Sequence, residues 1–330
     1  MAYSPNDARQ TTLTDLKTTH NDDSVPQSLD LSDKNTRNDD MTDALNEWVE
    51  DLQDATESAR DSETFREWLD TMAQFHDYSS RNALLIKLQK SDATRVASMS
   101  TWNDLGRSVK SGSSAIWIRC PIITDKCPEC GNSPSYHSRV DCDNHEEGDP
   151  DEWNEGVVGF RPGMVFDVSQ TEGEPLPESP NVDARADDED HAESVLAQLM
   201  DAADTLDYEV AVVDPVEWSR DAKAVADTSA SPPEIEIQDR APAAAAGDLA
   251  HELAHAYLHS GSETPTRAGR EVEAEAVAYV VGRYFGLDVE GSRFYLAGWA
   301  GEETSEIRER MDTISRAAEA IIEAASEDTD

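Results

Sequence analysis

The chain has 330 residues, enough for two modest domains, and a net charge of −43 from 70 acidic and 27 basic residues. Seven tryptophans and a regular apolar periodicity exclude a disordered acidic protein for most of the chain. An even excess of acid is typical of surfaces that stay hydrated in concentrated salt, so we expect a protein of a halophile's cytoplasm. No charged leader and no apolar run of about 18 residues or more is present, so we expect neither secretion nor a membrane partner.

Two polar stretches divide the chain. Residues 1–40 are rich in Asp, Asn, Ser, Thr and Gln and have almost no bulky apolar side chains. Such a segment cannot offset the entropy of ordering, so we expect a flexible tail. Residues 172–190 carry three prolines and a dense acidic run, which predicts a linker.

The remaining sequence predicts an α+β protein built from two units. Residues 41–171 begin with apolar residues at helical spacing and continue into alternating patterns at 115–118 and 164–168, which predict two strands. Residues 191–326 have mostly helical periodicity, with a small sheet that includes a strand at 208–213. We therefore expect an α+β domain followed by a mostly helical domain.

A His-Glu-x-x-His motif stands in the second unit. His251 and His255 lie in an apolar, alanine-rich run that starts near Pro242, and this run predicts a helix. Residues four apart share one helix face, so both imidazoles can hold one zinc ion, and Glu252 can act as general base toward a water molecule. The alternative is a pair of surface histidines. The helix is apolar nearly all round, however, and buried imidazoles are costly without a partner such as a metal.

A catalytic zinc site usually needs a third protein ligand. Glu271, Glu273 and Glu275 follow on a second predicted helix. Glu271 and Glu275 share a face because they are four residues apart, whereas Glu273 points elsewhere. The alternative for any one of them is a solvated acidic face. For His259 we expect a role at the helix end, near the dipole, rather than as a ligand.

The zinc motif resembles a known family. The histidine motif, followed at this distance by Glu275-Ala276-Val277-Ala278-Tyr279, is similar to the ImmA/IrrE family of metallo-endopeptidases. The resemblance implies that Glu275 is the third zinc ligand and that Glu252 is the catalytic base. It also implies a protein or peptide substrate, which the sequence does not name. We expect the strand containing Ile235 and Ile237, just before the zinc helix, to pair with an extended peptide.

The first unit contains a basic island at residues 80–119. Its seven basic residues face only two acidic ones, Asp92 and Asp104, which indicates a polyanionic partner in a chain this acidic. Neighbouring aromatic residues can stack on unpaired bases, although ordinary core packing is the alternative for each of them. The expected DNA contacts are Tyr78, Arg81, Lys87, Lys90, Trp102, Arg107 and Lys110.

This unit also resembles a known domain. The motifs, in order, are Phe75-His76-Asp77-Tyr78-Ser79, Asn82, Trp102, Gly106-Arg107, Lys110-Ser111-Gly112 and Val165 to Thr171. They are similar to the N-terminal single-stranded-DNA-binding domain of ArdC-type antirestriction proteins. ArdC-type proteins join this domain to an ImmA/IrrE-like metallopeptidase half, so the resemblance covers about residues 41–325. It implies single-stranded DNA as a partner and an antirestriction or mobile-element-associated role. An insertion at about residues 125–155 departs from the pattern.

All four cysteines lie between residues 120 and 142, which favours a metal over disulfides in a reducing compartment. Cys127, Cys130, His137 and Cys142 form our preferred ligand set for a structural zinc knuckle that stiffens the insertion. Cys120 or His145 can replace one member. Buried cysteines without a metal are the alternative.

The sequence thus predicts a single-stranded-DNA-binding domain joined to a zinc-dependent metallo-endopeptidase. Two other functions stay open. One is a non-catalytic protein that protects DNA and holds only structural zinc. The other is a regulatory protease that cleaves a repressor when DNA binds. Glu252 distinguishes them, because this residue is dispensable for binding zinc but is needed to activate water.

Overall fold

The computed structural model describes residues 29, 31–57, 63–140, 142, 153–176, 189–259, 266–289, 299 and 301–326. The helices are α2 (Arg37–Glu57), α3 (Glu63–Gln74), α4 (Ser80–Gln89), α5 (Met99–Asp104), α6 (Pro134–His137), α7 (Glu189–Thr205), α8 (Pro242–Leu258), α9 (Arg267–Tyr284) and α10 (Thr304–Ser326). The strands are β1 (Val96–Ala97), β2 (Arg107–Val109), β3 (Ile116–Asp125), β4 (Glu155–Asp167), β5 (Thr171–Gly173), β6 (Glu209–Val213), β7 (Ala224–Asp227) and β8 (Glu234–Gln238). The mixed α+β class is confirmed. None of the described helices has the length and apolarity of a membrane span.

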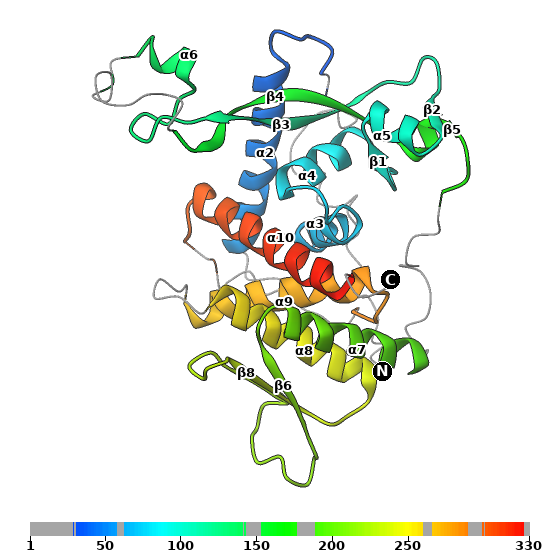
Figure 1. Cartoon of the computed structure of the whole chain (residues 1–330), viewed down its shortest axis with the longest axis vertical. Coiled ribbons are helices and arrows are strands. Elements are labelled where there is room, and N and C mark those ends of the chain that lie inside the picture. Colours follow the sequence, from blue (N-terminus) through cyan, green and yellow to red (C-terminus); the bar gives the residue numbers. More distant parts are fainter. Residues whose placement is uncertain are drawn as a thin grey trace, which may run out of the picture.

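A long antiparallel ribbon of β3 and β4 dominates the N-terminal half, and β1 extends it on the other side of β4 (Figure 1). Helix α4 covers the outer edge of β3 with two side-chain amides. Asn82 exchanges two hydrogen bonds with the backbone of Arg119, at 3.0 and 2.9 Å, and Gln89 does the same for Trp117 at 2.8 Å. These amides satisfy edge groups that would otherwise be open to another strand.

The junction after β4 depends on one buried carboxylate. Asp167 is 1% exposed and accepts hydrogen bonds from the backbone N–H groups of Thr94 at 2.7 Å and Ser169 at 2.9 Å. The side-chain oxygen of Gln170 accepts a hydrogen bond from the backbone N–H of Asp167, which completes a capping box. Asp167 thereby ties the β1 segment to the short 3₁₀ helix of residues Val168–Gln170.

The C-terminal half packs α7, α8 and α9 against one another and places a three-stranded sheet beside α8 (Figure 1). The strand order is β6-β8-β7, with β8 parallel to β6 and antiparallel to β7. Ile235 and Ile237 of β8 are 0% exposed and pack into the core. Strands β6 and β7 are therefore the two edges of this sheet.

The two halves share one hydrophobic core, although the sequence suggested two tethered domains. Helix α3 packs on α9, and α10 lies between the N-terminal helices and α7–α9 (Figure 1). Phe65 of α3 meets Trp299 edge-on at 5.3 Å between ring centroids. The physical reason is burial: the apolar faces of α3 and α10 are too large to stay exposed in separate domains.

Segment boundaries also differ from the expected ones. Helix α2 begins at Arg37, and Leu31 is only 4% exposed, so the described end of the stretch 1–40, which we expected to be a tail, is folded onto the protein. Residues 1–28 and 30 lie outside the described residues, as do residues 177–188 of the expected linker. The insertion at 125–155 is described only up to residue 140, at Cys142 and from residue 153.

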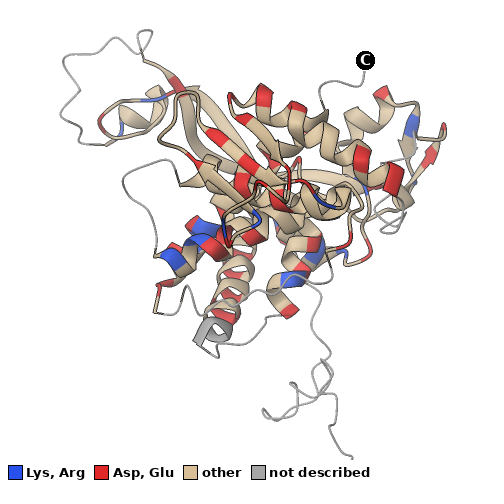
Figure 2. Ribbon diagram, turned by 90° about the horizontal axis from the view of Figure 1, so that it is seen from below, with Lys and Arg blue, Asp and Glu red and all other residues tan. Residues whose placement is uncertain are grey.

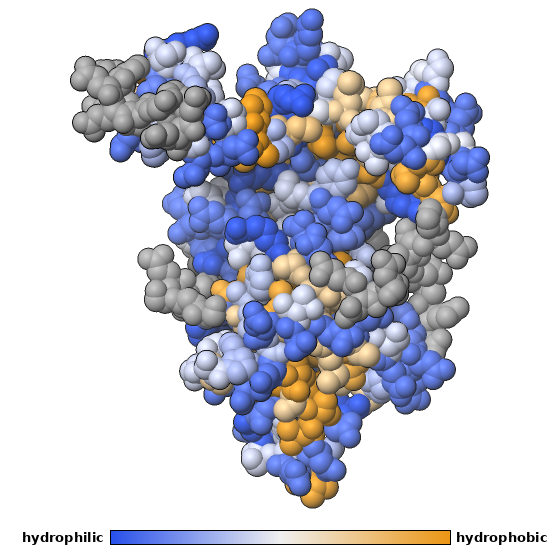
Figure 3. All heavy atoms as spheres, viewed as in Figure 1, coloured by the Kyte–Doolittle hydropathy of each residue, from blue (hydrophilic) through white to orange (hydrophobic). Residues whose placement is uncertain are grey.

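Acidic side chains are spread over the helices of both halves rather than gathered on one face (Figure 2). The face drawn in Figure 3 is mostly hydrophilic, with an apolar area at its lower end over β6 and the loop that follows it. Val212 and Val216 are 48% and 93% exposed there. The even distribution of acid agrees with a surface that stays hydrated in salt.

Candidate functional site

Helix α8 brings the two motif histidines together. Pro242 opens the helix at a position where its missing N–H costs nothing, and the alanines that follow favour helix. Leu249 and Leu253, both 0% exposed, fix the face that enters the core. One turn apart on the open face, the Nε2 atoms of His251 and His255 lie 3.1 Å from each other. Two imidazole nitrogens therefore converge on one point, as the spacing predicted.

A carboxylate from α9 completes the cluster. Oε2 of Glu271 lies 3.7 Å from the Nε2 atom of His251 and 3.7 Å from that of His255. These three groups can each offer a ligand atom within 4.8 Å of the others. Two imidazoles and one carboxylate are a donor set that suits zinc, so the residues fit the expected metal.

Glu275, expected as the third ligand, takes a different position. Its Oε2 lies 3.4 Å from Nδ1 of His251, on the ring nitrogen away from the cluster. Metal-binding histidines commonly donate this second N–H to a carboxylate, which fixes the tautomer and orients the ring. The geometry thus favours Glu271 as ligand and Glu275 as the orienting group. Both share the face that the spacing predicted, and the crossing of α8 and α9 decides between them.

The electrostatics favour metal binding by His255 more than by His251. Burial, together with the charges of His251 and His259, lowers the pKa of His255 to about 3, so this imidazole is neutral at physiological pH. Burial also lowers the pKa of His251, but the hydrogen bond and charge of Glu275 outweigh it and raise the pKa above its ordinary value. A neutral imidazole has the free lone pair that a metal requires.

Glu252 lies in a cleft of about 660 Å³ beside this cluster. Burial raises the pKa of its carboxyl, while the charge of His251 and a hydrogen bond from the backbone of Ala226 oppose the rise. The cleft wall opposite α8 is β7, whose residues Ala224 to Ala226 line it. A carboxyl group with a raised pKa beside a cluster of potential metal ligands suits a general acid and base.

The strand beside the cleft is β7, not the expected strand with Ile235 and Ile237. That strand, β8, is paired on both sides and has no free edge for a peptide. The sequence pattern missed β7 because its four residues, Ala224 to Asp227, are too short and too small to stand out.

A buried ionic cluster lies behind the site. Glu273, 2% exposed, accepts a 2.6 Å hydrogen bond from Arg310 of α10, as expected for a residue that points away from the metal ligands. Arg310 also binds Glu302 through two nitrogens, at 2.8 and 2.9 Å. The side chain of His259 is 7% exposed, with its Nε2 3.6 Å from Glu273, and burial lowers its pKa. His259 therefore belongs to this cluster and is no metal ligand among the described groups.

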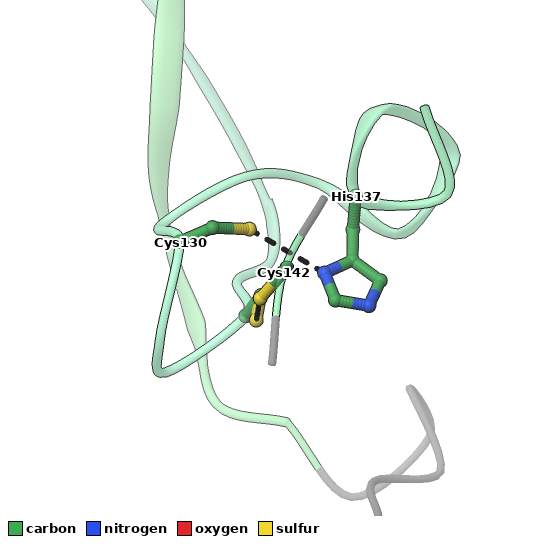
Figure 4. A group of neighbouring side chains, drawn as sticks. Cys130, His137 and Cys142 are labelled. Atoms are coloured by element: carbon green, nitrogen blue, oxygen red, sulfur yellow. Dashed lines mark hydrogen bonds between the residues drawn. The ribbon is translucent and has the colours of Figure 1, made fainter. Parts of the chain in front are cut away.

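The second cluster lies at the far end of the β3–β4 ribbon (Figure 4). Sγ of Cys127 is 3.9 Å from Sγ of Cys142, and Sγ of Cys130 is 3.4 Å from Nδ1 of His137. All four residues can place a ligand atom within 4.8 Å of the others, and none of the described cysteines forms a disulfide. The preferred set is thus brought together, and its Cys₃His composition suits structural zinc.

The two substitutes for this set stand elsewhere. Cys120 lies in the middle of β3, opposite Arg161, and is not part of the cluster. His145 lies outside the described residues.

The two aromatic residues expected to stack on DNA already contact other parts of the protein. Trp102 is 2% exposed, and its Nε1 donates a 2.8 Å hydrogen bond to the carbonyl of Phe166, so this ring presents almost no surface on which a base could stack. Tyr78 is half-buried and donates a 3.0 Å hydrogen bond to the carbonyl of Val96. Packing against β4 buries the ring of Trp102, whereas the hydroxyl of Tyr78 is held by β1 and its ring stays partly exposed. Phe160 of β4, which the sequence reading passed over, is 44% exposed.

The basic residues that we expected to contact DNA differ in whether a carboxylate of the protein already pairs with them. Arg81 pairs with Asp312 of α10 at 2.8 Å, and Lys90 pairs with Asp92 at 2.7 Å. Arg107 binds the hydroxyl of Thr171 at 2.9 Å. Lys87 and Lys110 donate only to backbone carbonyls, those of Ser91 at 2.7 Å and Ser169 at 2.9 Å. These two lysines therefore keep their positive charge without a carboxylate partner in the described part of the chain.

Comparison with known proteins gives a sequence relative, two solved structures of another protein and a family match. An uncharacterized protein of Bacillus anthracis is 28% identical over 293 residues, which are 81% of this chain and 48% of that protein. The chain thus spans about half the length of this relative. The crystal structure of the antirestriction protein ArdC from plasmid R388, metal-free, is 15% identical with a TM-score of 0.42, covering 76% of this chain and 85% of that one. Its Mn(II)-bound structure is 14% identical with a TM-score of 0.40, covering 76% and 86%. Finally, residues 35–157, which include α2 to α6 and the start of β4, match the family of the N-terminal domain of the anti-restriction factor ArdC.

Proposed function

We propose that the chain is a zinc-dependent metallo-endopeptidase of ArdC-like, antirestriction type, with a nucleic-acid-binding N-terminal half. The observation that carries the peptidase is the convergence of His251, His255 and Glu271 beside Glu252, in a cleft that runs along an edge strand. Such a cleft offers a metal site, a proton acceptor and a backbone to pair with, which are the parts that amide hydrolysis needs.

The chemistry divides among few groups. A zinc ion held by His251, His255 and Glu271 would polarise a carbonyl and make water a better nucleophile. Glu252 accepts a proton from water as the C–O bond forms and passes it to the departing amine as the C–N bond breaks. The raised pKa of Glu252 suits both transfers. Glu275 keeps the ring of His251 in position.

The test compares wild type with Glu252→Gln. Both proteins should bind the same amount of zinc, and only the wild type should cleave a mixture of unstructured proteins, with mass spectrometry as the readout. Loss of zinc in Glu252→Gln would mean that Glu252 is a ligand. Equal cleavage by both proteins would exclude Glu252 as the base.

We propose single-stranded DNA as the partner of the N-terminal half. The match of residues 35–157 to the ArdC N-terminal domain and the basic island support it. Binding of a single-stranded oligonucleotide, with duplex DNA as competitor, tests this proposal. Equal competition by the duplex would remove the preference for unpaired bases.

A regulatory protease that responds to DNA is the second candidate, and the contact between the halves favours it. Asp70 of α3 accepts hydrogen bonds from Tyr279 at 2.9 Å and Arg283 at 3.2 Å, both on the helix that carries Glu271. A movement of α3 caused by DNA binding would therefore shift α9, and with it the proposed metal ligand Glu271. Cleavage of candidate repressors with and without single-stranded DNA tests this candidate, with Glu252→Gln as the inactive control.

The Cys₃His cluster is proposed as a structural zinc site. Small loops without a core of their own are commonly fixed by such a metal, and no described residue of 121–160 belongs to either hydrophobic cluster of the protein. We also propose that the protein works in the concentrated salt of a halophile's cytoplasm, on the basis of its charge of −43.

A further inference from the structure

The edge of β7 that faces the cleft can be assigned from its pairing with β8. The carbonyl of Lys223 accepts a 2.9 Å hydrogen bond from Gln238, and Ala224 is the partner of Ile237 in the antiparallel register. Hydrogen-bonded positions alternate along an antiparallel strand, so the backbone groups of Ala224 and Ala226 point away from β8.

An extended peptide can therefore add to β7 on the side where Glu252 stands. Backbone pairing of this kind selects no sequence, because every residue offers the same N–H and C=O groups. The small side chains of Ala222, Ala224 and Ala226 in the cleft wall add no deep apolar pocket. Selectivity must then come from the charged groups that line the cleft.

The acidic and basic side chains that line the cleft differ in whether they have a partner of opposite charge. Among the acidic ones, Asp248 pairs with Arg240 at 2.8 Å, and Glu271 stands in the metal ligand cluster. The basic ones are Lys223, at the start of β7, and Arg267 and Arg270, on the first turns of α9. Lys223 and Arg267 are exposed and form no ion pair within the described residues, although the chain has 70 acidic residues against 27 basic ones.

We infer that this cleft selects acidic polypeptide segments, with Lys223 and Arg267 binding a substrate carboxylate on either side of the bond to be cut. The inference rests on the proposed peptidase function and adds its substrate class. Arg forms paired hydrogen bonds with carboxylates, and such charge-assisted bonds persist in salt better than distant charge attraction does.

Peptide binding to the Glu252→Gln protein tests the inference without requiring turnover. The probes are fluorescein-labelled, C-terminally amidated peptides of Ala, Gln and Val that carry two central glutamates, two glutamines or two lysines. A glutamine peptide with a free C-terminal carboxylate distinguishes a terminal carboxylate from a side-chain one. We expect the glutamate peptide to bind about tenfold more tightly than the glutamine peptide, the scale of one charge-assisted hydrogen bond.

Charge reversals locate the effect. Arg267→Glu and Lys223→Glu should each remove the preference for glutamate, whereas Arg316→Glu, the same change on an exposed residue of α10 outside the cleft, should keep it. Using two reversals on different elements guards against one variant that folds poorly. If the Arg316→Glu protein lost the preference as fully as the other two, net charge rather than the cleft would be responsible and the inference would fail.

The remaining outcomes separate the inference from the proposed function. Equal binding of all peptides, with cleavage retained by the wild type, would overturn the acidic preference and leave the peptidase intact. Absence of both peptide binding and cleavage would overturn both. Displacement of the glutamate peptide by a single-stranded oligonucleotide would assign the cations to phosphate instead and overturn the inference.

Discussion

Oε2 of Glu275 lies 3.4 Å from Nδ1 of His251, on the opposite ring nitrogen from the one that meets His255 and Glu271. This relationship separates the roles of two glutamates that stand one helical turn apart. A carboxylate on Nδ1 orients the ring and increases its basicity, whereas a carboxylate on the Nε2 side shares the metal. Their removal should therefore have different consequences.

Glu271→Ala should abolish metal binding in the cleft, and Glu275→Gln should weaken it by about 10- to 100-fold, the usual cost of losing an orienting partner. Competition between the protein and a fluorescent zinc chelator measures both affinities. Glu309→Gln, an exposed change on α10, serves as control. The reverse order of effects would return Glu275 to the ligand position that the family resemblance implied.

Zinc content should reach about two ions per chain, one for each cluster. Cys127→Ser should remove one ion and Glu271→Ala the other, so that the double variant binds none. Cys120→Ser is the matched control, because this thiol lies outside the Cys₃His cluster. Metal analysis after dialysis gives the stoichiometry. Loss of an ion in Cys120→Ser would show that the ligand set differs from Cys127, Cys130, His137 and Cys142.

Removing one partner of the buried ion pair Glu273–Arg310 should destabilise the protein more than replacing both partners with apolar residues. Arg310→Met leaves the buried Glu273 without a cationic partner, which should lower the free energy of unfolding by about 3–5 kcal/mol. Adding Glu273→Leu should restore part of this loss, since the unpaired charge is then gone. Urea unfolding of the single and double variants measures the difference. A double variant less stable than Arg310→Met would mean that the apolar pair fits the site badly.

Asp167 should contribute stability that depends on pH. Burial raises the pKa of its carboxyl, but hydrogen bonds from Ser169, Thr94 and Arg95 outweigh burial and bring the pKa below its ordinary value. Because the pKa is depressed in the folded state, Asp167 contributes its full stability at pH values above the pKa of an unfolded aspartate, about 3.9. This stability is lost as the pH falls through the lower pKa of the folded state.

Asp167→Asn should therefore be less stable than wild type by about 1–2 kcal/mol at neutral pH, the usual worth of a capping carboxylate. This gap should narrow as the pH falls below about 4. Thermal unfolding of both proteins across that range provides the measurement. A gap that stays constant with pH would show that shape, rather than charge, gives Asp167 its role.

Local patterns predicted the parts of the site that local geometry determines. The spacing of His251 and His255 is set by one turn of helix, and the cysteine cluster by a short loop, so both were found from the sequence. The choice between Glu271 and Glu275 depends on how α8 and α9 cross, which no spacing within α9 reveals. The burial of Trp102 depends on a carbonyl 64 residues away, and the shared core depends on contacts between α3 and α9. Long-range packing decided each of these points.

The last prediction concerns the salt dependence of DNA binding. Lys87 and Lys110 bind only backbone carbonyls, whereas Lys90 is already paired with Asp92 at 2.7 Å. Each lysine that neutralises a phosphate of a single strand releases a counterion and contributes about 0.7 to the slope of log affinity against log salt. Lys87→Ala and Lys110→Ala should therefore each reduce this slope by about 0.7 and weaken binding at low salt, with little effect in concentrated salt.

Lys90→Ala is the matched control and should change the slope less, because its charge is already compensated. Fluorescence anisotropy of a labelled single-stranded oligonucleotide, titrated at several salt concentrations, gives all the slopes. Three equal decreases would mean that Asp92 releases Lys90 to the phosphates when DNA binds. Unchanged slopes in Lys87→Ala and Lys110→Ala would place the nucleic acid on another surface, and the exposed ring of Phe160 on β4 is the next position to vary.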